Sequence, residues 1–149
     1  MLTELKYFFS QFNFLLATDI AVLMATASVS RIKKGELLIK AGELHYHLHV
    51  VLKGLFRTYV SREDGEERTV YLASRGMPMG SSKTVFANRP GNENVVALED
   101  SIVLGIDHRS FKQICEGNPA LFKMYMKMME KSMLEAIERI EYHVVLNSD

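Results

Sequence analysis

The chain contains 149 residues, of which 48% are apolar and 24% are charged. This composition is typical of one compact domain with a buried core, and it excludes a disordered chain. The 18 lysines and arginines balance 18 aspartates and glutamates, which excludes a protein that holds nucleic acid through an overall positive surface.

The first segment, residues 1–28, is expected to form two short helices. Apolar side chains recur in it at spacings of three and four residues: Leu5, Phe8, Phe9, Phe12, Leu15 and Leu16. Thr18 or Asp19 is expected to cap the second helix, Ile20 to Ala27. The segment has no secretory leader pattern, and no apolar run of the chain approaches the ~20 residues that cross a bilayer. We therefore expect a cytoplasmic protein that does not enter membranes.

Residues 29–106 are expected to form short strands separated by glycine turns. Gly35 is expected to form a turn between two short strands over residues 31–39, and the alternation from Leu48 to Leu52 predicts a half-buried strand. The pair Asp64-Gly65 is typical of a hairpin that joins strands over residues 55–60 and 68–73. Two more strands are expected at residues 95–98 and 102–106. About seven short strands with this spacing indicate an antiparallel β-roll or jelly roll, that is, a double-stranded β-helix.

Residues 107–149 are expected to be helical. Asp107 is placed to cap a short helix, and Asn118 with Pro119 is typical of the start of a long helix, from about residue 119 to about Val145. The expected fold is therefore mainly β with helices at both ends, within one domain over residues 1–149. The N-terminal helices cover residues 1–28, and the β-roll covers residues 29–106.

The sequence gives little support to nucleophilic catalysis. There is no GxSxG elbow, and Cys115, the only cysteine, falls in the middle of an expected helix with no feature that activates a thiol. We therefore expect a protein that is not an enzyme and holds no certain cofactor.

Three alternating histidines, His45, His47 and His49, would share one face of a strand and so could bind a metal ion. A cupin-like metalloenzyme is the minor alternative that follows from them. However, Lys53 and Lys83 stand where a cupin has its carboxylate and its later histidine. Exposed histidines at the rim of the roll, without a metal, are the favoured interpretation.

The segment from residue 68 to residue 92 contains no acidic residue. It carries four cations, Arg68, Arg75, Lys83 and Arg89, and a glycine turn at Gly80 that could lead into a helix whose first amides bind an anion. A solvated loop explains the same residues equally well. A nucleotide-triphosphate P-loop is excluded, because Ser82 stands where that motif needs a glycine before Lys83.

The expected long helix carries an apolar stripe at steps of three and four residues: Phe122, Met126, Met129, Met133, Ile137, Ile140 and Val144. The stripe could lie on the roll of its own chain or form the seam of a homodimer. Its length favours the homodimer, because the end of a small roll cannot cover it.

The order of these features resembles the cyclic-nucleotide-binding domain of Crp/Fnr-type transcriptional regulators. The resemblance rests on KKGELLIKAGE (Lys33 to Glu43), VVLKGLFRTYV (Val50 to Val60), EDGEERTVYL (Glu63 to Leu72) and VVALEDSIVLGID (Val95 to Asp107). It implies a β-roll with helices at its ends, a long helix that dimerises, and a regulatory sensor role. A helix-turn-helix usually follows the long helix in that family, and we expect no DNA contact from the chain as given.

The resemblance places a ligand site between Gly76 and Val95. In members that bind cyclic AMP, a glutamate grips the ribose and an arginine neutralises the cyclic phosphate, whereas the matching positions here hold Ser81 and Gly91. The helix positions that would contact the base hold Ala136 and Ile137. The implied ligand is a cyclic nucleotide or another small phosphate or anion, with Lys83 or Arg89 in place of the lost arginine. The site would be framed by Gly80, Ser81, Ser82, Lys83, Arg89, Gly91 and Asn92.

A second hypothesis keeps the scaffold without a ligand. The missing glutamate and arginine favour a dimerisation or partner-docking module that has lost small-molecule binding, whereas the acid-free segment favours the sensor.

Overall fold

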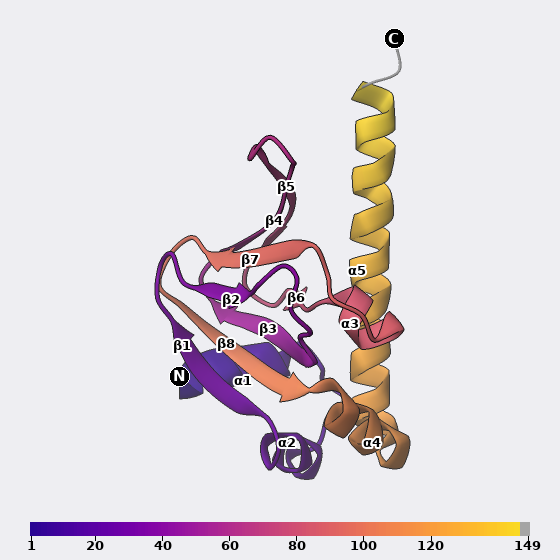
Figure 1. Cartoon of the computed structure of the whole chain (residues 1–149). Coiled ribbons are helices and arrows are strands. Elements are labelled where there is room, and N and C mark those ends of the chain that lie inside the picture. Colours follow the sequence, from indigo (N-terminus) through magenta and orange to yellow (C-terminus); the bar gives the residue numbers. More distant parts are fainter. Residues whose placement is uncertain (147–149) are drawn as a thin grey trace.

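Two four-stranded antiparallel sheets form the centre of the computed structural model (Figure 1), which describes residues 1–146. The first sheet has the order β1-β8-β3-β6 and the second has the order β2-β7-β4-β5. The first contains β1 (Ser28–Ile32), β8 (Ser101–Asp107), β3 (His47–Lys53) and β6 (Pro78–Met79). The second contains β2 (Leu37–Ile39), β7 (Glu93–Ala97), β4 (Phe56–Ser61) and β5 (Glu67–Ala73). The expected antiparallel β-roll is confirmed.

Helices lie before, within and after the roll. They are α1 (Leu2–Ser10), α2 (Ala17–Met24), α3 (Ser82–Ala87), α4 (His108–Gly117) and α5 (Pro119–Leu146). The expected caps are confirmed: Asp107 accepts a hydrogen bond from the Ser110 amide, and Asn118 accepts one from the Leu121 amide, each at 3.0 Å. Residues 147–149, the end of the expected segment 107–149, lie outside the described residues.

The second N-terminal helix begins earlier than expected, so the prediction that Thr18 or Asp19 caps it is wrong. α2 starts at Ala17, and Asp19 lies within its first turn, where its carboxylate accepts a hydrogen bond from the Leu16 amide at 2.8 Å. The same carboxylate accepts a second bond from the Asn118 side chain at 2.9 Å. Both hydrogen bonds hold the pKa of Asp19 below its usual value, and the bond from the Leu16 amide has the larger effect. They tie α2 to the start of α5.

Apolar side chains pack in two clusters, one on each face of the first sheet. The inner cluster, between the sheets, consists of Ile32, Ile39, Val51, Phe56, Ala73, Met79, Val95, Ala97 and Val103. The outer cluster, between the first sheet and the helices, includes Phe8, Phe9, Leu23, Leu52, Ile102, Leu104, Ile106, Phe111, Cys115, Leu121 and Met124.

The prediction of a half-buried strand at β3 is therefore wrong. Val51 and Leu52 point to opposite faces of the sheet, yet they are 0% and 1% exposed. The helices cover the face of Leu48, Val50 and Leu52. The opposite face, which the sequence pattern left open to solvent, places Val51 in the inner cluster between the two sheets. Figure 1 shows that the C-terminal part of α5 extends beyond the sheets, on the side towards which the β4–β5 hairpin projects.

Candidate ligand site

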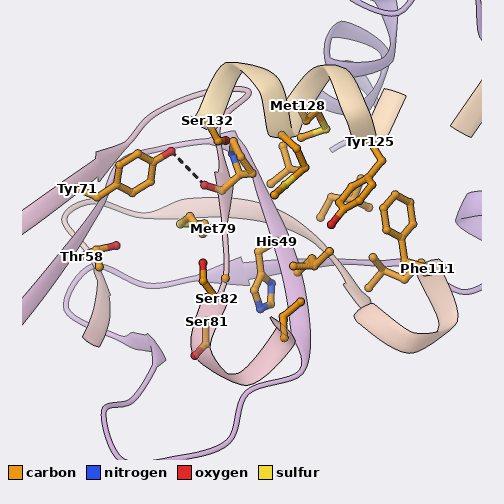
Figure 2. A pocket seen from close by; sticks show the side chains of 18 of the residues that line it. His49, Thr58, Tyr71, Met79, Ser81, Ser82, Phe111, Tyr125, Met128 and Ser132 are labelled. Carbon is orange, nitrogen blue, oxygen red and sulfur yellow. Dashed lines mark hydrogen bonds between the residues drawn. The ribbon is translucent and has the colours of Figure 1, made fainter. Parts of the chain in front are cut away.

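A cavity of about 440 Å³ lies between the roll and α5, within the range of roughly 300–1,000 Å³ typical of small-molecule sites. Its walls include residues of strands β3, β4, β5 and β8, of the segment from β6 into α3, and of α5. Figure 2 shows Tyr71 and Thr58 at one end of the cavity and Tyr125 and Phe111 at the other.

Most of the cavity wall is apolar. It includes Phe8, Leu48, Val50, Met79, Val85, Phe86, Leu104, Ile106, Phe111, Met124, Tyr125, Met128 and Met129. Four of these side chains are methionines, whose flexible thioethers repack around ligands of different shapes. The cavity therefore suits a ligand with a substantial apolar part.

Polar groups are few and come from several elements. They are His49, Thr58, Tyr71, Ser81, Ser82, Glu93, Ser132 and Arg139. Among the described residues that line the cavity, Nδ1 of His49 and Oγ of Ser132 are buried without a hydrogen-bond partner. Buried polar groups in proteins nearly always have one. These two atoms, one on β3 and one on α5, are therefore suited to contact a bound molecule.

The candidate residues from the sequence divide into two groups. Gly80, Ser81 and Ser82 line the cavity, whereas the lining does not include Lys83, Arg89, Gly91 or Asn92. The Lys83 ammonium donates a hydrogen bond to the Asn92 side chain, and the Arg89 side chain is exposed.

Ser81 and Gly91, the positions that the resemblance assigns to the missing glutamate and arginine, lie against each other. A Cβ atom on Gly91 would lie 2.9 Å from Oγ of Ser81. The Ser81 hydroxyl is buried and donates to Oγ1 of Thr84 at 3.1 Å, which in turn donates to the Arg89 carbonyl at 2.9 Å. Neutral hydroxyls and backbone groups thus stand where the family places two charges.

The four cations of residues 68–92 do not gather in one place. Arg68 pairs with Glu66 at 3.2 Å on the β4–β5 hairpin. The Arg75 guanidinium lies 3.5 Å from the ring centroid of Tyr7 on α1, a cation–π contact. Two of the four charges therefore have partners outside the segment.

The histidines are not all at an exposed rim, so that prediction is wrong for His49. His49 is 9% exposed, and its Nε2 lies 2.9 Å from Nε2 of His45, which is half-buried, while His47 is exposed. Burial lowers the pKa of His49 to about 3, with smaller contributions from the charges of His45 and His47. His49 is therefore neutral at pH 7. Within residues 1–146, no group of three or more histidine, cysteine, aspartate or glutamate side chains is placed to hold a metal ion.

Five polar residues of the cavity were missed by the sequence analysis: Thr58, Tyr71, Glu93, Ser132 and Arg139. The Arg139 guanidinium stacks on the Tyr71 ring, 4.8 Å from its centroid, and donates to the Val70 carbonyl. The Tyr71 hydroxyl donates to the Pro78 carbonyl at 3.2 Å, and burial raises its pKa to about 12. A sequence signal did exist, because residues 125, 128, 132, 136 and 139 follow three- and four-residue steps along a second face of the long helix.

The apolar stripe of α5 divides between two faces. Met129 lines the cavity, but the other members are exposed: Phe122, Met126, Met133, Ile137, Ile140 and Val144. The alternative in which the whole stripe packs on its own roll is therefore wrong. No helix in residues 1–146 is long and apolar enough to cross a membrane.

Comparisons with known proteins agree with this architecture. The family model of the cyclic nucleotide-binding domain matches residues 29–118. A cyclic nucleotide-binding domain from Methylobacillus flagellatus KT superposes with a TM-score of 0.74 at 16% identity, covering 97% of this chain and 85% of that one. No curated protein sequence matches the chain.

Two longer regulators also share the fold. The catabolite activator protein of Thermus thermophilus gives a TM-score of 0.70 at 18% identity, and the match covers 88% of this chain but 61% of that one. CprK, solved with o-chlorophenolacetic acid, gives 0.65 at 15% identity, with 90% and 55% covered. The chain thus spans about three fifths of the Thermus protein. At these identities the likeness shows the fold alone.

Proposed function

Because the chain belongs to the cyclic nucleotide-binding domain family, we propose that it is a cytoplasmic, non-enzymatic sensor domain of the Crp/Fnr type. In this proposal residues 1–149 form one domain whose ligand binds in the cavity between the roll and α5. The observation that carries it is the pair of buried atoms without partners, Nδ1 of His49 and Oγ of Ser132, in the lining of one cavity. A ligand that reaches both joins the roll to α5.

Such a ligand acts by selecting one position of α5. A molecule that contacts both the roll and the helix binds best when the two are correctly spaced, so binding shifts the population towards that spacing. α5 carries the change away from the cavity, because its C-terminal part extends beyond the sheets (Figure 1).

Cyclic AMP is not the expected ligand. The loss of a guanidinium that pairs a phosphate costs about 2–5 kcal/mol, a weakening of tens to thousands of fold. Here that position is Gly91, and the ribose-binding position is Ser81. We propose a different small molecule, which Gly80, Ser81 and Ser82 contact from the α3 side of the cavity.

We also propose that two copies pair along the exposed face of α5. Met126, Met133 and Ile140 are 40%, 65% and 63% exposed, and apolar side chains at this spacing are typical of a helix–helix seam. Val144 extends the same face towards the end of the helix.

Filling the cavity tests the sensor proposal. Ala136 lines the cavity, and Ala136→Phe adds a ring there, whereas the matched control Ala21→Phe adds one at an exposed position of α2. We expect small molecules that raise the melting temperature of the wild type and of Ala21→Phe to have no effect on folded Ala136→Phe. If no compound of a broad metabolite library stabilises the wild type, or if Ala136→Phe responds like the wild type, the sensor proposal is wrong. The partner-docking module would then be favoured.

A further inference from the structure

We propose that Arg139 is the anion-binding residue of the cavity and that the ligand is an organic acid, with one anionic group on an apolar body. This inference rests on the proposed sensor function and names the ligand class. It places the anion site on the long helix α5, rather than at residues 80–92 around α3, where the sequence analysis expected it.

The first observation is the position of the positive charge. Arg139 is the one lysine or arginine among the residues that line the cavity, whereas Lys83 and Arg89 are absent from the lining. An anion inside the cavity therefore finds its cation on α5.

The second observation is that the Arg139 guanidinium retains binding capacity. A guanidinium has five N–H donors, and one bond to the Val70 carbonyl is found together with the stacking on Tyr71. Arg139 forms no ion pair among residues 1–146. The cation–π contact with Tyr71 and the bond to Val70 hold the guanidinium in place, and its remaining donors match the two oxygens of a carboxylate or phosphate.

Two carboxylates at or beside the cavity narrow the ligand class. Glu93 lines the cavity from β7, and the charge of Glu135, one turn before Arg139, acts on Tyr71. Both repel an anion, so a free inorganic anion gains little from Arg139 alone. Burial of an apolar body must supply most of the binding free energy.

The cavity accommodates such a body along α5. Ser132, whose Oγ lacks a partner, lies two turns before Arg139, about 10 Å along the axis. Beyond it, Met128 and Tyr125 continue the lining, and the Tyr125 ring meets Phe111 edge to face at 5.2 Å. The cavity thus has a charged end at Arg139, a hydroxyl midway and an aromatic end.

Matched acids and amides separate the charge from the body. Octanoate and 4-phenylbutyrate, together with the neutral amide of each, are titrated against the wild type and four variants. The variants are Arg139→Gln, Arg139→Lys, Arg89→Gln and Arg62→Gln. Arg62→Gln is the control, because Arg62 pairs with Glu66 on the exposed hairpin. We expect the wild type to bind at least one acid about tenfold or more tightly than its amide. Arg139→Gln should lose that preference and keep its affinity for the amide. Arg139→Lys should keep part of the preference, and Arg89→Gln and Arg62→Gln should keep all of it.

Several results would overturn the assignment. Equal, saturable binding of acids and amides by the wild type leaves the sensor function standing and removes only the role of Arg139. An acid preference that survives in Arg139→Gln, or disappears in Arg89→Gln, places the anion elsewhere. Absence of binding by every acid and amide counts against both the ligand class and the sensor function. Binding of the amide also shows that Arg139→Gln is folded. If Arg139→Gln does not fold, Arg139→Lys decides: the proposal is contradicted if this variant keeps the whole preference for the acid over its amide, or loses all of it.

Discussion

A Cβ atom on Gly91 would lie 2.9 Å from Oγ of Ser81, so the two positions to which the resemblance assigns the cyclic AMP contacts are adjacent here, and both lack charge. The Ser81 hydroxyl donates to Oγ1 of Thr84, so a larger residue at position 91 requires the Ser81 side chain to move.

Restoring the arginine should create affinity for cyclic AMP. We expect Gly91→Arg to bind cyclic AMP at least tenfold more tightly than the wild type, because a paired phosphate is worth about 2–5 kcal/mol. Gly91→Ala is the matched control, because it adds the Cβ atom without the charge. Isothermal titration of the three proteins decides the matter, and equal affinities in folded variants would show that position 91 does not face the phosphate.

Stability should fall as the pH falls from 7 to 5, and His49 should cause much of the loss. Its pKa is about 3 in the folded state, against the ordinary histidine value of 6.5, so the unfolded chain takes up a proton that the folded chain does not. For a group with this shift the loss is about 2 kcal/mol over that interval. Urea unfolding of His49→Gln should show a pH dependence weaker by this amount. His143→Gln, at an exposed position near the end of α5, should behave like the wild type.

Two glycines with positive φ angles should differ in their tolerance of alanine. Gly54 has φ +114, and its added Cβ would lie 2.0 Å from Oγ of Ser101, whereas Gly65 has φ +86 and nothing within 4 Å. Gly65→Ala should cost only the backbone strain, about 1–2 kcal/mol. Gly54→Ala adds steric overlap of about 1–3 kcal/mol. Equal denaturation midpoints for the two variants would contradict the close approach at Gly54.

Charge on the exposed face of α5 should separate the two copies. Met133 and Ile140 lie seven residues apart on that face, and Met133→Glu or Ile140→Glu would bury a carboxylate in an apolar seam. We expect sedimentation to show a dimer for the wild type and a monomer with an intact roll for either variant. A wild-type monomer at high concentration, or a dimer that both variants retain, would exclude the seam.

Local signals in the sequence were sufficient for much of the fold. The hairpin at Asp64-Gly65 and the caps at Asp107 and Asn118 depend on residues within three positions of one another, and all three are confirmed. The strand order is not local, since β1 pairs with β8 across most of the chain. The burial of β3 on its second face, that of Val51, also depends on the distant strands of the second sheet, which the alternation of Leu48 to Leu52 cannot reveal.

The candidate site was predicted only in part, for the same reason. Gly80, Ser81 and Ser82 are contiguous and begin with the glycine turn that was expected to lead into a helix, so they could be identified together from the sequence. Arg139 reaches the cavity beside Val70 and Tyr71, more than 65 residues earlier in the chain. Only the packing of α5 against the roll brings these residues together.

The central claim is that a ligand in the cavity joins the roll to α5, and amide hydrogen exchange tests it most directly. Exchange is measured with and without saturating 4-phenylbutyrate, or whichever acid of the panel binds most tightly. The account predicts slower exchange both in residues 78–86 and in residues 124–139, with no change at the hairpin turn of residues 61–67. Protection confined to one of the two walls, or unchanged exchange at saturation, would contradict it.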